Sequence, residues 1–156
     1  MTRPGGPIVV GVSPTTGSPA ALHWAAEEAQ LRGTKLRAVL AWRAPRAPLA
    51  AGGRPPVGLT QAASDPAGDA EQMLRGFVAA ALGSDDGVDC TAVKGGAVHA
   101  LLAAADDALM IVVGEPRPGR VAAMRASLVA PVLLAQAKCP VVAMPSAVMR
   151  AEATGG

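Results

Sequence analysis

The sequence predicts an α/β fold in which one open, parallel, five-stranded sheet carries helices on both faces. Apolar runs of strand length alternate along the chain with segments of helical period, as in consecutive βαβ units. The segment 70–82 gives the clearest helical signal, because its apolar residues recur at intervals of three and four. A chain of 156 residues is long enough to bury its own core, so we expect residues 1–156 to form one domain with a core at about 7–145.

The first half of the chain is expected to form two strands and two helices. Residues 7–12 and 35–42 are apolar runs that predict the first two strands. Residues 19–32 lie between them with a helical apolar period, and Gly33 is a typical helix stop. Residues 43–66 are rich in Pro, Gly and Ala without any period, so we expect a mobile excursion before the helix at 70–82.

The second half is expected to hold three further strands, two helices and a frayed tail. The strands are expected at 87–93, 109–113 and 140–144, the helices at 97–106 and 130–137, and the tail at 146–156. Pro131 disfavours a helix start at Ser127, because its ring would press on the Ser127 carbonyl. Proline favours the first helical position, so the helix is expected to begin near Ala130.

Composition argues against several classes of protein. The net charge of +2 comes from scattered basic residues, whereas nucleic-acid-binding proteins concentrate Lys and Arg on one face. No apolar run approaches the roughly 18 residues of a membrane span, and the N-terminus does not resemble a signal peptide, so we expect a cytoplasmic protein without membrane contact. Cys90 and Cys139 lack ligand spacing and are interpreted as buried thiols.

The polar residues do not predict an enzyme. His23 and His99 have no partner at catalytic spacing, and a catalytic histidine needs both a nucleophile and an orienting group. Asp106 and Asp107 end the third helix and are interpreted as a solvated pair. No catalytic residue and no metal site are therefore assigned.

Five segments together resemble the universal stress protein family over about residues 7–145. They are Ile8 to Val12, Pro19 to Ala29, Leu36 to Trp42, Val112 to Gly114, and Cys139 to Val142. The resemblance implies five parallel strands in the order 3-2-1-4-5 and a dimer. In one branch of the family it also implies ATP bound at the carboxyl ends of the strands.

The sequence departs from the ATP-binding branch at the residues that meet the nucleotide. That branch has an Asp after the first strand, and this chain has Ser13. Its loop pattern of three glycines and a hydroxyl falls on Gly114, Arg117, Ser127 and Leu128. Glycines there let backbone N–H groups approach phosphate closely, and Gly119 is displaced by two residues from the motif position.

Two functional hypotheses remain open. The first is a stress-response regulatory or binding module, acting as a homodimer with an unknown protein partner, in which nucleotide binding is weakened or lost. The second is a true adenine-nucleotide binder with an altered phosphate loop; under the first, no cofactor is expected and ATP binds weakly at most. The candidate residues of the second hypothesis are Gly11, Ser13, Ala41, Gly114, Arg117 as phosphate clamp, Gly119, Ser127 and Leu128. A transferase or ligase is disfavoured because its extra catalytic motifs are missing from the sequence.

The last strand predicts the dimer interface. It has no polar alternation although the implied fold makes it an edge, and an uncovered apolar edge pairs or aggregates. A symmetric second copy is the simplest cover, with the two strands antiparallel. The residues expected to form this interface are Pro140, Val141, Val142, Ala143 and Met144.

Overall fold

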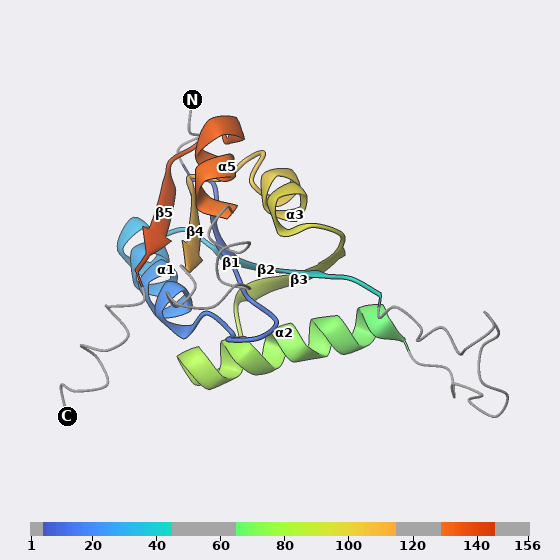
Figure 1. Ribbon diagram of the computed structural model, residues 1–156. Coiled ribbons are helices and arrows are strands. Elements are labelled where there is room, and N and C mark those ends of the chain that lie inside the picture. The colour runs from blue at the N-terminus through green and yellow to red at the C-terminus, as the bar shows by residue number, and fades with distance from the viewer. Residues whose placement is uncertain (1–4, 45–64, 115–128, 146–156) are drawn as a thin grey trace, which may run out of the picture.

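The computed structural model describes residues 5–44, 65–114 and 129–145 (Figure 1). Within these ranges the chain forms five strands and four helices. In chain order they are β1 (Ile8–Gly11), α1 (Pro19–Arg32), β2 (Leu36–Trp42), α2 (Pro66–Leu82), β3 (Val88–Lys94), α3 (Ala97–Ala104), β4 (Met110–Gly114), α5 (Val129–Gln136) and β5 (Val141–Met144). All pairings are parallel and the strand order is β3-β2-β1-β4-β5, which confirms the predicted fold and order.

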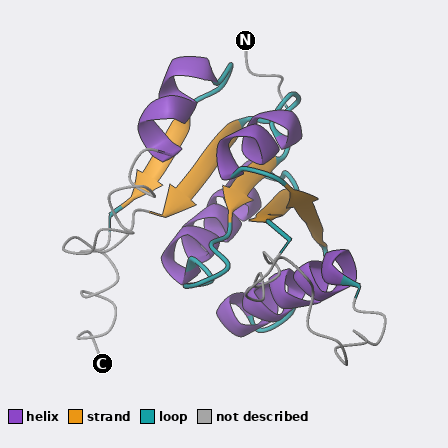
Figure 2. Cartoon of the chain, turned by 45° about the vertical axis from the view of Figure 1, so that its right-hand side comes forward, coloured by secondary structure: helices purple, strands orange, loops and turns teal. Residues whose placement is uncertain are grey.

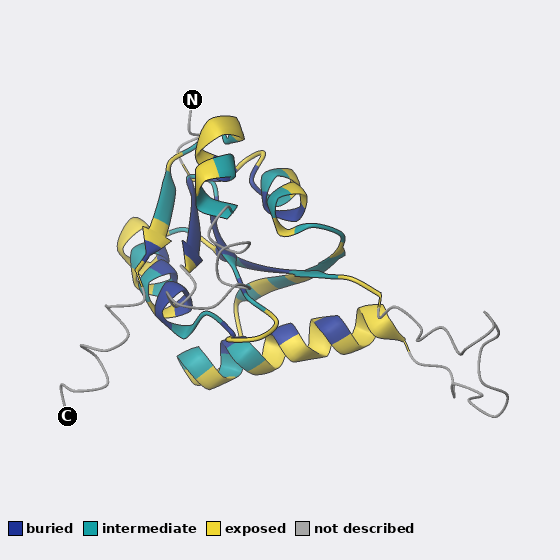
Figure 3. Ribbon diagram, viewed as in Figure 1, coloured by how far each residue is buried: buried dark blue, intermediate teal, exposed yellow. Residues whose placement is uncertain are grey.

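The helices cover the sheet in pairs. Alternate residues of a strand point to opposite faces, and β1 separates them clearly. Val10 packs in one apolar cluster with α1 and α2, whereas Val9 packs in the other with α3 and α5 (Figure 2). The central strands β1 and β4 are apolar and almost fully buried, as expected where helices cover both faces (Figure 3).

The strand register brings the carboxyl ends of the strands to one edge of the sheet. Gly11 at the end of β1 pairs with Val39, and Gly114 at the end of β4 pairs with Met144. Ala41 lies two residues beyond Val39 on β2, about 7 Å farther along the strand. The candidate residues that the structure describes therefore lie at this edge or in the loop that follows β1.

Two predicted helix boundaries are wrong. The third helix ends at Ala104, not Asp106: Ala105 leaves the helical conformation with φ −102° and ψ 12°, and Arg37 Nη1 donates a hydrogen bond to the freed Ala104 carbonyl oxygen at 2.7 Å. The same nitrogen forms an ion pair with Asp107 Oδ1 at 3.0 Å, so Asp107 is held and is not simply solvated. Helix α2 begins at Pro66, which the sequence assigns to the excursion.

Other predicted positions need smaller corrections or fall outside the described ranges. The apolar period places Met73 on the buried face of α2, but Met73 is 47% exposed, because the helix buries the line through Leu74 and Val78. The remainder of the predicted excursion, 45–64, and the predicted tail, 146–156, are not described. The predicted start of the last helix near Ala130 stays a prediction, since α5 is described only from Val129.

The two cysteines are half-buried thiols, not fully buried ones. Cys90 packs against the cluster under α1 and α2, and Cys139 packs against the cluster under α3 and α5. Burial raises the pKa of both thiols above the ordinary value of 9.0. For Cys90 the nearby Arg75 opposes part of this rise in pKa. Both thiols are therefore biased toward the neutral form.

Candidate functional site

The loop after β1 is a tight turn closed by its own hydroxyl groups. The Ser13 N–H donates to Ser18 Oγ at 3.0 Å, and the Gly17 N–H donates to the Ser13 carbonyl at 2.8 Å. Ser13 Oγ shares a hydrogen bond with Thr15 Oγ1 at 2.9 Å and accepts another from the Thr15 N–H at 3.3 Å. Ser13 is therefore engaged within the turn on both its backbone and its side chain.

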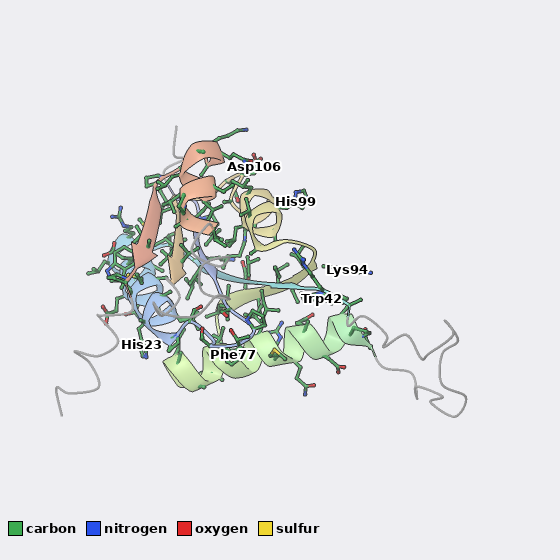
Figure 4. The ribbon with its side chains drawn as sticks, viewed as in Figure 1. His23, Trp42, Phe77, Lys94, His99 and Asp106 are labelled. Atoms are coloured by element: carbon green, nitrogen blue, oxygen red, sulfur yellow. The ribbon has the colours of Figure 1, made fainter. Side chains whose placement is uncertain are left out.

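The turn depends on two residues with left-handed backbone conformations. Gly17 has φ +73° and is buried, and a Cβ at its position would lie 2.5 Å from Phe77 Cδ1 of α2. Ser18 has φ 47°, the one positive value at a non-glycine residue in the described ranges. Such conformations are strained and persist where the surrounding structure imposes them. Helix α2 thus supports the turn through Phe77 (Figure 4).

Glycines allow the turn, β4 and α3 to approach one another. A Cβ on Gly11 would lie 3.2 Å from Leu101 Cδ1 and 3.3 Å from Val113 Cγ1. A Cβ on Gly114 would lie 3.7 Å from Ser18 Oγ, so Ser18 faces the end of β4. Gly11, Ser13 and Gly114 are thus gathered at the carboxyl edge.

Four of the eight candidate residues can be placed. Gly11, Ser13, Ala41 and Gly114 lie at the carboxyl edge, and Ala41 packs on the side of the sheet that α3 covers. The other four lie outside the described residues: Arg117, Gly119, Ser127 and Leu128. Sequence reasoning misses Ser18 and Phe77. Only the Gly-Ser pair before Pro19 signals a special turn in the sequence.

Positive charge at the carboxyl edge is found at the ends of β2 and β3 in the described ranges. Lys94 Nζ lies 5.9 Å from the centroid of the Trp42 ring, a cation–π distance (Figure 4). The Trp42 indole nitrogen is buried and has no hydrogen-bond partner within the described ranges. Arg43 extends toward Gly96 at the start of α3. These cations lie across β1 from Gly114, the last residue of β4.

The histidines show no catalytic arrangement. His23 on α1 and His99 on α3 are both exposed, and neither has a hydrogen bond or ion pair to another described residue (Figure 4). Among the described residues no group of three or more His, Cys, Asp or Glu could hold a metal ion. None of the described helices is both long and apolar enough to span a bilayer.

Comparison of the sequence with known protein families gives a match over most of the chain. The model of the universal stress protein family matches residues 6–145. This chain belongs to the universal stress protein family. No curated protein matches the sequence.

Solved structures of universal stress proteins share the fold. A universal stress protein in complex with cAMP has a TM-score of 0.60 at 20% identity, covering 92% of this chain and 99% of that one. UspA from Lactobacillus plantarum has a TM-score of 0.54 at 18% identity, with the same coverages of 92% and 99%. The Archaeoglobus fulgidus protein in complex with dAMP has a TM-score of 0.50 at 21% identity, with coverages of 90% and 98%.

Proposed function

We propose that this universal stress protein is a single-domain stress-response module that acts as a homodimer and whose nucleotide binding is weakened or lost. The observation that carries the proposal is the hydrogen bonding of the Ser13 side chain. Its hydroxyl stands where the ATP-binding branch has a carboxylate, and it is already bonded to Thr15. We assign the protein a regulatory or binding role with an unidentified protein partner, and not an enzymatic one.

Physical chemistry links that substitution to affinity. Hydrogen bonds to an ionised acceptor contribute about 1.5–3 kcal/mol, against about 0.5–1.5 kcal/mol for neutral pairs. A nucleotide base would also have to compete with Thr15 for the Ser13 hydroxyl. The replacement of two motif glycines by Arg117 and Ser127 adds Cβ atoms where backbone N–H groups should approach phosphate.

The alternative is an adenine-nucleotide-binding protein with an altered phosphate loop. Gly11 and Gly114 are retained at the carboxyl edge, where bulkier residues would meet Leu101, Val113 and Ser18. The solved relatives in complex with cAMP and dAMP support a nucleotide ligand. In this version the guanidinium of Arg117 clamps phosphate in place of glycine N–H groups.

The proposal includes a homodimer that forms through β5 and a cytoplasmic location. Strand β5 is an outer strand of the sheet, with Val141 and Val142 half-buried and Ala143 exposed. A second copy paired antiparallel would cover this edge. Cys90 and Cys139 are both free thiols, which suits the reducing cytoplasm.

Calorimetry with ATP separates the two versions. We expect the wild-type protein to show no dissociation constant below about 100 μM, roughly −5.5 kcal/mol. Ser13→Asp, which restores an ionised acceptor, should tighten binding. Ser84→Asp adds the same charge before β3, at the opposite edge, and serves as the matched control.

A low-micromolar constant in the wild-type protein would contradict the main proposal. If that constant disappeared in Arg117→Ala, the alternative would be established. A Ser84→Asp variant that gained as much affinity as Ser13→Asp would show that added charge, and not the position of Ser13, is responsible.

A further inference from the structure

A groove of about 440 Å³ lies between α1 and the end of α2, away from the candidate nucleotide site. Leu36 and Val88, the first residues of β2 and β3, line it, so it opens at the amino edge of the sheet. The candidate nucleotide residues lie at the carboxyl edge. The groove is therefore a separate feature, and a ligand bound in it would not compete with a nucleotide.

The floor of the groove is apolar. Small and aliphatic side chains from both helices and both strands form it: Ala26, Ala29, Leu36, Ala81, Leu82 and Val88. Leu31, four residues after Glu27 on the same helix, is a large apolar side chain that is 81% exposed. Exposed apolar surface of this kind is typical of an interaction site.

The rim of the groove carries unneutralised negative charge. Glu27 on α1 and Asp86 in the turn before β3 line it and are exposed, and neither forms an ion pair with another described residue. The carboxylates next to them in sequence are neutralised: Glu28 by Arg32 at 3.0 Å and Asp85 by Arg75 at 3.3 Å.

The other polar groups of the rim include no further acidic residue and no Lys or Arg among the described residues. Apart from the two carboxylates, the polar lining residues are His23, Gln30, Thr34 and Ser84. The protein as a whole carries a formal charge of +2, so an acidic groove runs against its overall balance. The local potential therefore favours a cationic ligand.

We propose that this groove docks a short segment of a partner protein in which apolar side chains are flanked by lysine or arginine. The apolar floor would bury the aliphatic side chains, and Glu27 and Asp86 would pair with cations on either side of them. A bare metal ion does not fit, because among the described residues no group of three His, Cys, Asp or Glu converges there.

Three labelled peptides test the proposal with the intact protein by fluorescence anisotropy. The first has leucines flanked by lysines, the second replaces the lysines with glutamates, and the third replaces the leucines with serines. We expect saturable binding of the first peptide alone, weakened as salt rises from about 50 to about 300 mM.

Neutralising the rim gives the decisive comparison. Glu27→Gln and Asp86→Asn should each raise the dissociation constant about threefold, as loss of one exposed ion pair does. Asp106→Asn removes an exposed carboxylate from the loop after α3 and should leave binding unchanged. Circular dichroism of each variant confirms that the fold is retained.

Four results of the binding measurements would overturn the proposal. They are no saturable binding of the basic apolar peptide up to about 1 mM, equal binding of the acidic peptide, equal binding of the leucine-free peptide, and a dissociation constant unchanged in both rim variants. Equal binding of the leucine-free peptide would show that the groove binds polycations in general. Self-association lost in Glu27→Gln would assign it to a second copy of this chain, which also contradicts the proposal.

Discussion

The contact between Gly17 and Phe77 makes the turn after β1 the most sensitive point of the candidate site. Gly17→Ala would place a Cβ 2.5 Å from Phe77 Cδ1 and 2.9 Å from Cε1, closer than real Cβ contacts occur. The backbone at this position also has φ +73°, which L residues adopt rarely. The substitution therefore combines conformational strain with overpacking.

The expected loss is the sum of these two contributions. A left-handed conformation costs an L residue about 1–2 kcal/mol. Forcing an extra carbon into a packed contact adds about 1–3 kcal/mol. The free energy of unfolding should therefore fall by about 2–5 kcal/mol in Gly17→Ala, which lowers Tm by several degrees in a domain of this size.

Gly33→Ala is a matched control. Gly33 ends α1 with φ +61°, but a Cβ there meets nothing within 4 Å. This variant should lose only the conformational contribution, about 1–2 kcal/mol. In a Phe77→Leu background the ring is gone, so Gly17→Ala should then cost about as much as Gly33→Ala.

Urea denaturation of the single and double variants measures these differences. Equal losses for Gly17→Ala and Gly33→Ala would show that Phe77 yields without cost and that α2 does not support the turn. A Gly17→Ala loss that persists unchanged in the Phe77→Leu background would locate the strain in the backbone alone.

Three further predictions concern the loop, the edge strand and the thiols. Arg117→Gly combined with Ser127→Gly and Leu128→Ser should make ATP binding easier to detect by calorimetry, and unchanged binding would point to Ser13 or Pro131 as the obstruction. Ala143→Glu places charge on the exposed side of β5 and should shift a wild-type dimer toward monomer in light scattering; a dimer that persists refutes this interface. Folding raises the pKa of the Cys90 thiol above its ordinary value of 9.0. The neutral thiol therefore contributes fully to stability below pH 9.0, and this contribution is lost as the pH rises through the pKa of the thiol in the folded state. The free energy of unfolding should therefore fall above about pH 9, and it should fall less steeply in Cys90→Ala. Identical slopes in the wild-type protein and the variant would show that Cys90 does not cause the fall.

The sequence predicts the elements well because their signals are local. The apolar run at 7–12 and the helical period at 70–82 need no knowledge of the rest of the chain. The strand order comes from the resemblance to a family and not from the periodicity. The structure confirms both the elements and the order.

The details of the candidate site could not be predicted because they depend on long-range contacts. Phe77 meets Gly17 across 60 residues of sequence, and nothing in either segment indicates the other. Arg37 reaches Ala104 and Asp107 in the same way, at the end of α3 that the sequence places too late. The left-handed backbone of Ser18 depends on its tertiary surroundings, since serine has no intrinsic preference for it.

The placement of the two cysteines determines what oxidation can do to this molecule. Cys90 lies on β3 and Cys139 just before β5, the two outer strands of a five-stranded sheet, and their side chains belong to opposite layers. Four strand spacings separate those edges by roughly 19 Å, far beyond the Cα separation that a disulfide tolerates. Oxidation can therefore crosslink separate copies but cannot tie one chain to itself. Each thiol also reports on the opening of its own layer, so their alkylation rates measure local unfolding of the two faces separately.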